Sequence, residues 1–103
     1  MYAPSTEATE LELYFQNEEW LIKPATIAIG KAFRHRETFS YERALRHLER
    51  RCIDAAKQYT REHGSITDRW SALFPLSARK AAAESILESM LDEFRLGNFW
   101  EVA

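Results

Sequence analysis

The chain contains few cysteines, which cross-link small folds, and few glycines and prolines, which interrupt helices and strands. Its 103 residues include one cysteine, three glycines and three prolines. A lone cysteine, Cys52, cannot form an internal disulfide, which excludes a disulfide-stapled secreted scaffold and favours a reducing compartment. Because glycine and proline are scarce, turns are few, and the sequence favours a few long helices over many short strands.

Long apolar runs and targeting signals are also lacking. No apolar stretch approaches the roughly 20 residues that a membrane-spanning helix needs, so we expect no membrane partner. Residues 1–10 show no basic region followed by an apolar run, so no secretory signal is visible. Together with the single cysteine, these absences predict a cytoplasmic protein.

The motifs of common enzymes are missing too. The glycines stand far apart, so no glycine-rich loop is available to hold the phosphates of a nucleotide. Cys52 falls on the apolar face of a predicted helix, which indicates a small buried residue and not a nucleophile. We therefore predict a protein that is not an enzyme, with no catalytic residue and no cofactor.

Metal-ligand spacing is absent as well. None of the three histidines, His35, His47 and His63, stands three or four residues from another histidine or from Cys52. His47 and Cys52 are five residues apart. That spacing turns their side chains about 140° away from each other around a helix, too far to hold one ion. The sequence predicts no metal site.

What the chain does contain is enough apolar material for one ordinary core. Hydrophobic residues make up 46% of the chain and charged residues 29%, with a net charge of −2, so disorder is not expected. We predict one helical domain over residues 1–103, in which residues 1–9 form a flexible tail. The charge is uneven: residues 24–64 hold nine bases and five acids, and both flanking segments are acidic.

Two segments have strong helical periodicity. The first spans residues 41–63, with Ser40 as its N-cap and Gly64 ending it in a left-handed conformation. The second spans residues 78–96, with Ser77 as its cap and Gly97 as its stop. Both carry apolar residues at steps of three and four, so we expect them to pack as an antiparallel pair. A short helix over residues 67–74, capped by Thr67, should lie between them.

The first third of the sequence is less definite. Thr9 and Glu12 fit a capping box that opens a helix reaching residue 20, and Pro24 fits the first turn of a helix reaching residue 36. Alternating apolar residues from Leu11 to Phe15 would also fit a strand. Helices are preferred, because two isolated short strands form a marginal sheet. The predicted fold is all-α, a bundle of four to five helices around one long central helix; the alternative is α+β with a small N-terminal hairpin.

A basic row on the long helix is the most suggestive feature of the sequence. It recurs along one face at helical spacing and consists of Arg43, His47, Arg50, Lys57 and Arg61. The ordinary interpretation is a solvated face with internal ion pairs, because Glu42 can pair with Arg46 and Asp54 can reach both Arg50 and Lys57. A row of this kind also suits a macromolecular partner or the phosphates of a nucleic acid.

These features predict a non-enzymatic interaction protein: an adaptor, inhibitor or accessory factor that binds another macromolecule or itself. The protein partner is unidentified, and a two-fold homodimer is expected. The candidate partner-binding residues are those of the basic row together with two aromatics beyond the last helix, Phe99 and Trp100. A nucleic-acid-binding regulator is the less favoured alternative. An enzyme would need a polar cleft that gathers distant groups such as His35, Glu37 and Tyr59.

Overall fold

Five helices make up the part of the chain that the structure describes, residues 6–35 and 37–96. In this computed structural model they are α1 (Thr6–Asn17), α2 (Glu19–Arg34), α3 (Tyr41–His63), α4 (Trp70–Leu73) and α5 (Leu76–Arg95). The described residues contain no strand, so the all-α prediction is confirmed and the N-terminal hairpin is not supported.

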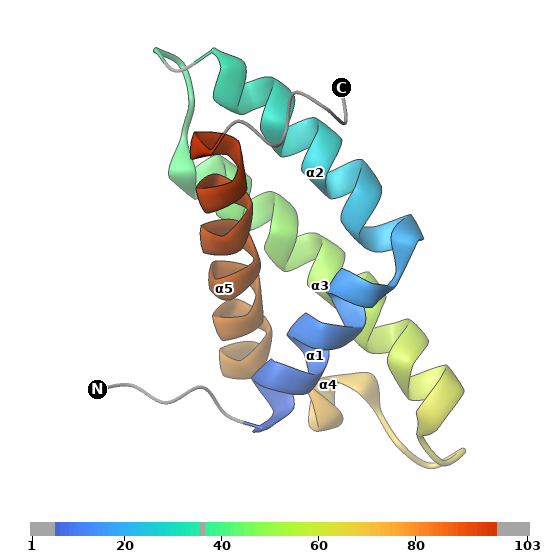
Figure 1. Cartoon of the computed structure of the whole chain (residues 1–103). Coiled ribbons are helices and arrows are strands. Elements are labelled where there is room, and N and C mark those ends of the chain that lie inside the picture. Colours follow the sequence, from blue (N-terminus) through green and yellow to red (C-terminus); the bar gives the residue numbers. More distant parts are fainter. Residues whose placement is uncertain (1–5, 36, 97–103) are drawn as a thin grey trace.

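Helix α3 is the long central element. Helix α2 runs back along it in the opposite sense, and α5 crosses α3, also in the opposite sense (Figure 1). As predicted, α3 and α5 pack together, and α1 adds a second partner for α5. The side chains that meet at the centre are fully buried; among them are Leu11, Phe15, Leu48, Cys52, Ile86 and Leu87.

The bounds of α3 agree with the prediction, but its end is built differently. At the start, Ser40 Oγ accepts a hydrogen bond from the Arg43 N–H at 3.3 Å, the expected N-cap. At the end, Gly64 is extended, with φ −88°, so the predicted left-handed conformation is wrong. Glycine is needed there for space: an added Cβ would lie 2.7 Å from the Thr60 carbonyl oxygen and 3.0 Å from Asp68 Oδ2.

Helices α4 and α5 differ from the prediction at their starts. The Asp68 carboxylate accepts from the Ser65 N–H at 2.6 Å, in a turn that precedes α4. Helix α4 therefore begins only at Trp70, and Thr67 is not its cap. Helix α5 begins at Leu76 with Pro75 in the cap position, so Ser77 lies inside the first turn. The stop predicted at residue 97 lies outside the described residues.

The N-terminal helices show the largest differences. Helix α1 begins at Thr6, so residues 6–9 are helical where a tail was expected, and it ends at Asn17 before residue 20. Helix α2 begins at Glu19, which places Pro24 inside it and not in its first turn. Proline has no N–H to offer the carbonyl one turn earlier, that of Trp20. Arg51 Nη2 donates to that carbonyl oxygen instead, at 3.3 Å.

No helix in residues 6–35 and 37–96 combines the length and the apolar character required to cross a bilayer.

Candidate functional site

The structure divides the predicted basic row into two parts. Arg43, His47 and Arg50 line a cleft between α2 and α3, whereas Lys57 and Arg61 lie further along α3 and do not line it. The first part therefore lies between two helices, whereas the second lies outside the cleft.

The α2–α3 cleft has a volume of about 440 Å³ and an unusual composition. Its apolar wall comes from Ala28, Ile29, Ala32 and Ala44. Its polar lining consists of two hydroxyl groups and four basic side chains: Thr38, Ser40, His35, Arg43, His47 and Arg50. None of these described lining residues carries a carboxylate, so the lining has an electrostatic preference for anions.

The acids expected to neutralise this row pair elsewhere. Asp54 binds Arg51 at 3.1 Å, and the expected pairs of Asp54 with Arg50 and Lys57 do not form. Glu42 does pair with Arg46, at 3.7 Å. Within the described residues, no carboxylate oxygen lies within 4.0 Å of a side-chain nitrogen of Arg43, His47 or Arg50. The guanidinium charges of Arg43 and Arg50 are therefore available to a ligand.

The surroundings of His47 in the cleft alter its pKa. Burial, followed by the nearby positive charges of Arg50 and Arg51, lowers the pKa of His47 below its ordinary value of 6.5. All three causes oppose the imidazolium form. At neutral pH the ring is therefore mostly uncharged, and it can take up a proton when an anion enters.

The second part of the row has partners of its own. The Lys57 ammonium lies 5.4 Å from the centroid of the Trp70 ring, and the Arg79 guanidinium lies 5.0 Å from the same ring. Trp70 therefore lies close to two cations, each in cation–π range. Arg61 Nη1 donates to Gln58 Oε1 at 3.2 Å.

A groove between α3 and α5 adjoins the cleft. It has a volume of about 290 Å³, and its apolar lining comes from Ile53 and Leu76, the latter 56% exposed. The rest of the described lining consists of four basic side chains and one acid: Arg46, Arg50, Arg79, Lys80 and Glu49. Arg50 lines both the groove and the cleft, so the two form one continuous surface, hereafter the basic face.

Sequence reasoning missed the part of this face contributed by α5. Arg79 and Lys80 lie near the start of α5, where the positive end of the helix dipole disfavours cations. Two bases placed against the dipole were the available signal, and one of them has a local partner: Arg79 Nε donates to the Phe74 carbonyl oxygen at 3.0 Å. Periodicity along α3 could not reveal it, because the groove needs both helices.

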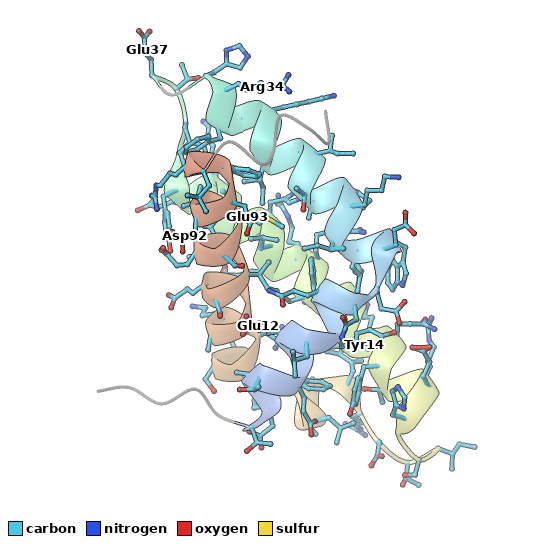
Figure 2. All side chains as sticks on the ribbon, in the orientation of Figure 1. Glu12, Tyr14, Arg34, Glu37, Asp92 and Glu93 are labelled. Carbon is cyan, nitrogen blue, oxygen red and sulfur yellow. The ribbon has the colours of Figure 1, made fainter. Side chains whose placement is uncertain are left out.

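The groups that an enzyme was expected to gather do not meet. His35 lines the α2–α3 cleft, beside the start of α3. Tyr59 lies near the other end of α3, with its ring centroid 5.1 Å from that of Phe74. Glu37 projects outward from the turn between α2 and α3 (Figure 2).

Tyrosines join the far end of α3 to α1. Tyr14, labelled in Figure 2, donates to Glu62, and Tyr59 donates to Glu10 at 3.5 Å. Burial and the neighbouring carboxylates raise the pKa of both phenols above 10. Both remain protonated at neutral pH, so their role here is to hold the two helices together.

Other reactive side chains are not arranged for chemistry. Cys52 is fully buried, and burial raises its pKa to about 12, which disfavours the nucleophilic thiolate. In the described ranges, no three His, Cys, Asp or Glu side chains are placed to share a metal ion. Phe99 and Trp100, predicted to contact a partner, lie outside the described residues.

Comparison of the chain with protein-family models, with curated proteins and with solved structures finds no significant match in any of the three.

Proposed function

We propose that this chain is a non-enzymatic interaction protein whose basic face binds an acidic, amphipathic segment of another protein. The observation that carries the proposal is the α3–α5 groove, whose described lining combines two apolar side chains with four basic side chains and a single acid. Protein–protein interfaces combine apolar and polar contacts in this way.

Leu76 is the apolar anchor of this surface. It stands at the start of α5 with 56% of its surface exposed, and the apolar core does not include it. An apolar side chain of a partner could contact Leu76 and Ile53 while its carboxylates meet the surrounding bases. An amphipathic helix laid in a groove supplies both kinds of group from one face.

The test is fluorescence anisotropy with a labelled helical peptide that carries a row of leucines flanked on both sides by glutamates. We expect binding that Leu76→Ser weakens about tenfold, because the apolar contact is lost. Leu13→Ser, which replaces a leucine of similar exposure outside the basic face, is the matched control, and Lys23→Gln is the control for charge; both should leave binding unchanged. Equal binding by the wild type and Leu76→Ser, or no binding at all, would reject the proposal.

A nucleic-acid partner is the second candidate. It is favoured by one observation: among the described residues, no carboxylate oxygen lies within 4.0 Å of a side-chain nitrogen of Arg43, His47 or Arg50. It is disfavoured by the apolar lining of the groove, because phosphates make no apolar contact with Leu76. A labelled duplex titrated at low and at near-physiological salt distinguishes the two. Binding that weakens steeply with salt and is unaffected by Leu76→Ser would favour the nucleic acid.

The two-fold dimer and the cytoplasmic location remain predictions. Sedimentation equilibrium over a range of concentrations tests the dimer. If the Leu76→Ser variant is monomeric where the wild type is dimeric, the occupant of the groove is a second copy of this chain.

A further inference from the structure

We propose that the α2–α3 cleft is a binding site for a phosphate monoester, whose phosphoryl group is held by Arg43 and Arg50 and whose organic part lies on the apolar wall of the cleft. This inference rests on the proposed function, because the cleft is part of the basic face. The proposed ligand of the cleft is a phosphate monoester, whereas that of the α3–α5 groove is an acidic protein segment.

The charge of the cleft matches a dianion. Two guanidinium groups, Arg43 and Arg50, line it, and none of the other lining residues that the structure describes carries a carboxylate. A phosphate monoester carries a charge of about −1.5 to −2 at neutral pH, whereas a carboxylate or a sulfate ester carries only one negative charge. Guanidinium groups bind phosphoryl oxygens through paired N–H bonds, which adds geometric preference to the charge.

The start of α3 reinforces this preference. Ser40, the N-cap, lines the cleft, so the positive end of the dipole of a long helix lies at its edge. The Ser40 hydroxyl oxygen accepts from the Arg43 N–H, and its own hydrogen can still donate to an anion. Thr38 already donates to the His35 carbonyl oxygen at 3.1 Å and offers the ligand only an acceptor.

The cleft is larger than a phosphoryl group requires. Its volume of about 440 Å³ falls in the range of small-molecule sites, roughly 300–1,000 Å³. The remaining space is bordered by Ala28, Ile29, Ala32 and Ala44. Because the alanine side chains are short, this wall leaves room for a ring or a short alkyl group. An ester with an apolar body should therefore bind more tightly than inorganic phosphate.

His47 makes binding depend on pH. The charged groups around it are Arg50 and Arg51 on α3, with Arg43 and His35 also lining the cleft. An anion in the cleft offsets their repulsion and raises the pKa of His47, so binding takes up a proton. For an anion of fixed charge, affinity should rise as the pH falls toward and below 6.5.

The first experiment is calorimetric titration of the full chain with phenyl phosphate and with inorganic phosphate. We expect phenyl phosphate to bind more tightly, and Arg43→Gln to weaken it about tenfold through loss of a charge-assisted hydrogen bond. Lys23→Gln again serves as the control of equal charge change. Circular dichroism verifies that each variant folds. If Arg43→Gln binds as the wild type does, or if phenyl phosphate does not bind, the inference is overturned.

The second experiment uses sulfate as a probe whose charge does not change near neutral pH. We expect sulfate to bind more tightly at pH 6 than at pH 8, and His47→Gln to abolish most of this dependence. If the sulfate affinity of His47→Gln changes with pH as much as that of the wild type, His47 is not the group that takes up the proton. The assignment of proton uptake to His47 is then overturned.

Two arms distinguish the source of the ester. A tyrosine-phosphorylated peptide that binds more tightly than phenyl phosphate indicates a modified side chain of a partner, whereas equal binding indicates a small molecule. Arg43→Gln affects the cleft alone and Leu76→Ser the groove alone, since neither residue lines the other site. If the wild type binds phenyl phosphate but not the acidic peptide, the result counts against the proposed function only, and the reverse result counts against this inference only.

Discussion

The guanidinium of Arg51 donates from Nη2 to the main-chain carbonyl oxygen of Trp20, 3.3 Å away on the neighbouring helix. That carbonyl is the one which Pro24 leaves without a helical N–H partner. Arg51 also lies 6.0 Å from the Trp20 ring centroid and pairs with Asp54 at 3.1 Å. One side chain thus compensates for a proline inside α2 and ties α2 to α3, the two helices that form the cleft.

Replacement of Arg51 should therefore cost more than replacement of an ordinary surface arginine. We expect Arg51→Met to lower the free energy of unfolding by about 1–2 kcal/mol, because a carbonyl oxygen loses its charged donor. Arg46→Met, which breaks only an exposed pair with Glu42, should cost at most about 0.5 kcal/mol. Urea unfolding followed by circular dichroism measures both.

A second substitution identifies the cause. Pro24→Ala supplies a backbone N–H at position 24 that can bond to the Trp20 carbonyl. In the Pro24→Ala background, the loss of unfolding free energy caused by Arg51→Met should be about 0.5–1 kcal/mol smaller than in the wild type. Strictly additive effects of the two changes would show that Arg51 stabilises the fold independently of the proline.

Gly64→Ala tests the close approach at the end of α3. The new methyl group would lie 2.7 Å from the backbone oxygen of Thr60. We expect a loss of about 1–3 kcal/mol of unfolding free energy, the usual cost of overpacking. Adding Asp68→Ala should not restore stability, since the shorter contact is with backbone. If Asp68→Ala fully restores the free energy of unfolding, the methyl group clashes with the Asp68 carboxylate and not with the backbone.

Cys52 should be protected from thiol reagents until the protein unfolds. With the thiol fully buried and its pKa raised to about 12, the native protein at pH 8 presents little thiolate and no access. Reaction with a disulfide reagent should be slower than in concentrated urea by on the order of a thousandfold or more. Ser71→Cys in a Cys52→Ala background supplies an exposed thiol as the control. Equally fast reaction of the two native proteins would contradict the burial.

The tyrosines predict a loss of stability at alkaline pH. Tyr14, Tyr41 and Tyr59 have folded-state pKa values raised by burial and by neighbouring carboxylates. A raised folded pKa contributes stability that is present below the unfolded value of about 10 and is lost as the pH rises through the folded value. Unfolding near pH 10–11 then releases protons, so stability should fall with pH in that range.

Tyr14→Phe isolates the contribution of one phenol to this fall. The variant should be less stable than the wild type at pH 7, because it lacks the hydrogen bond to Glu62. The difference between the two proteins should shrink between pH 9 and pH 11. Urea midpoints at these pH values provide the measurement, and a difference that stays constant would exclude titration of Tyr14 from the effect.

Local signals were sufficient to predict the helices that carry them. The Ser40 cap and the three- and four-residue spacing gave the bounds of α3 correctly, because both depend on residues within the helix itself. The start of α2 was predicted wrongly for a complementary reason. A proline inside a helix is tolerated here through Arg51, a partner 31 residues from Trp20 that no local pattern reveals.

The candidate site was predictable in part for the same reason. Periodicity placed Arg43, His47 and Arg50 on one face, and the structure puts all three in the cleft. It could not tell that Asp54 pairs with Arg51 and not with Arg50 or Lys57, since all three bases are within helical reach. That choice depends on where α2 holds Arg51.

Because Arg50 lines both the cleft and the groove, the two sites share a donor that only one occupant can fully engage. A ligand that draws the guanidinium into the cleft withdraws it from whatever lies in the groove. The two ligands should then be antagonists, and the factor by which each weakens the other must be the same in both directions. A shared arginine would thereby let a small anion control the release of a much larger partner.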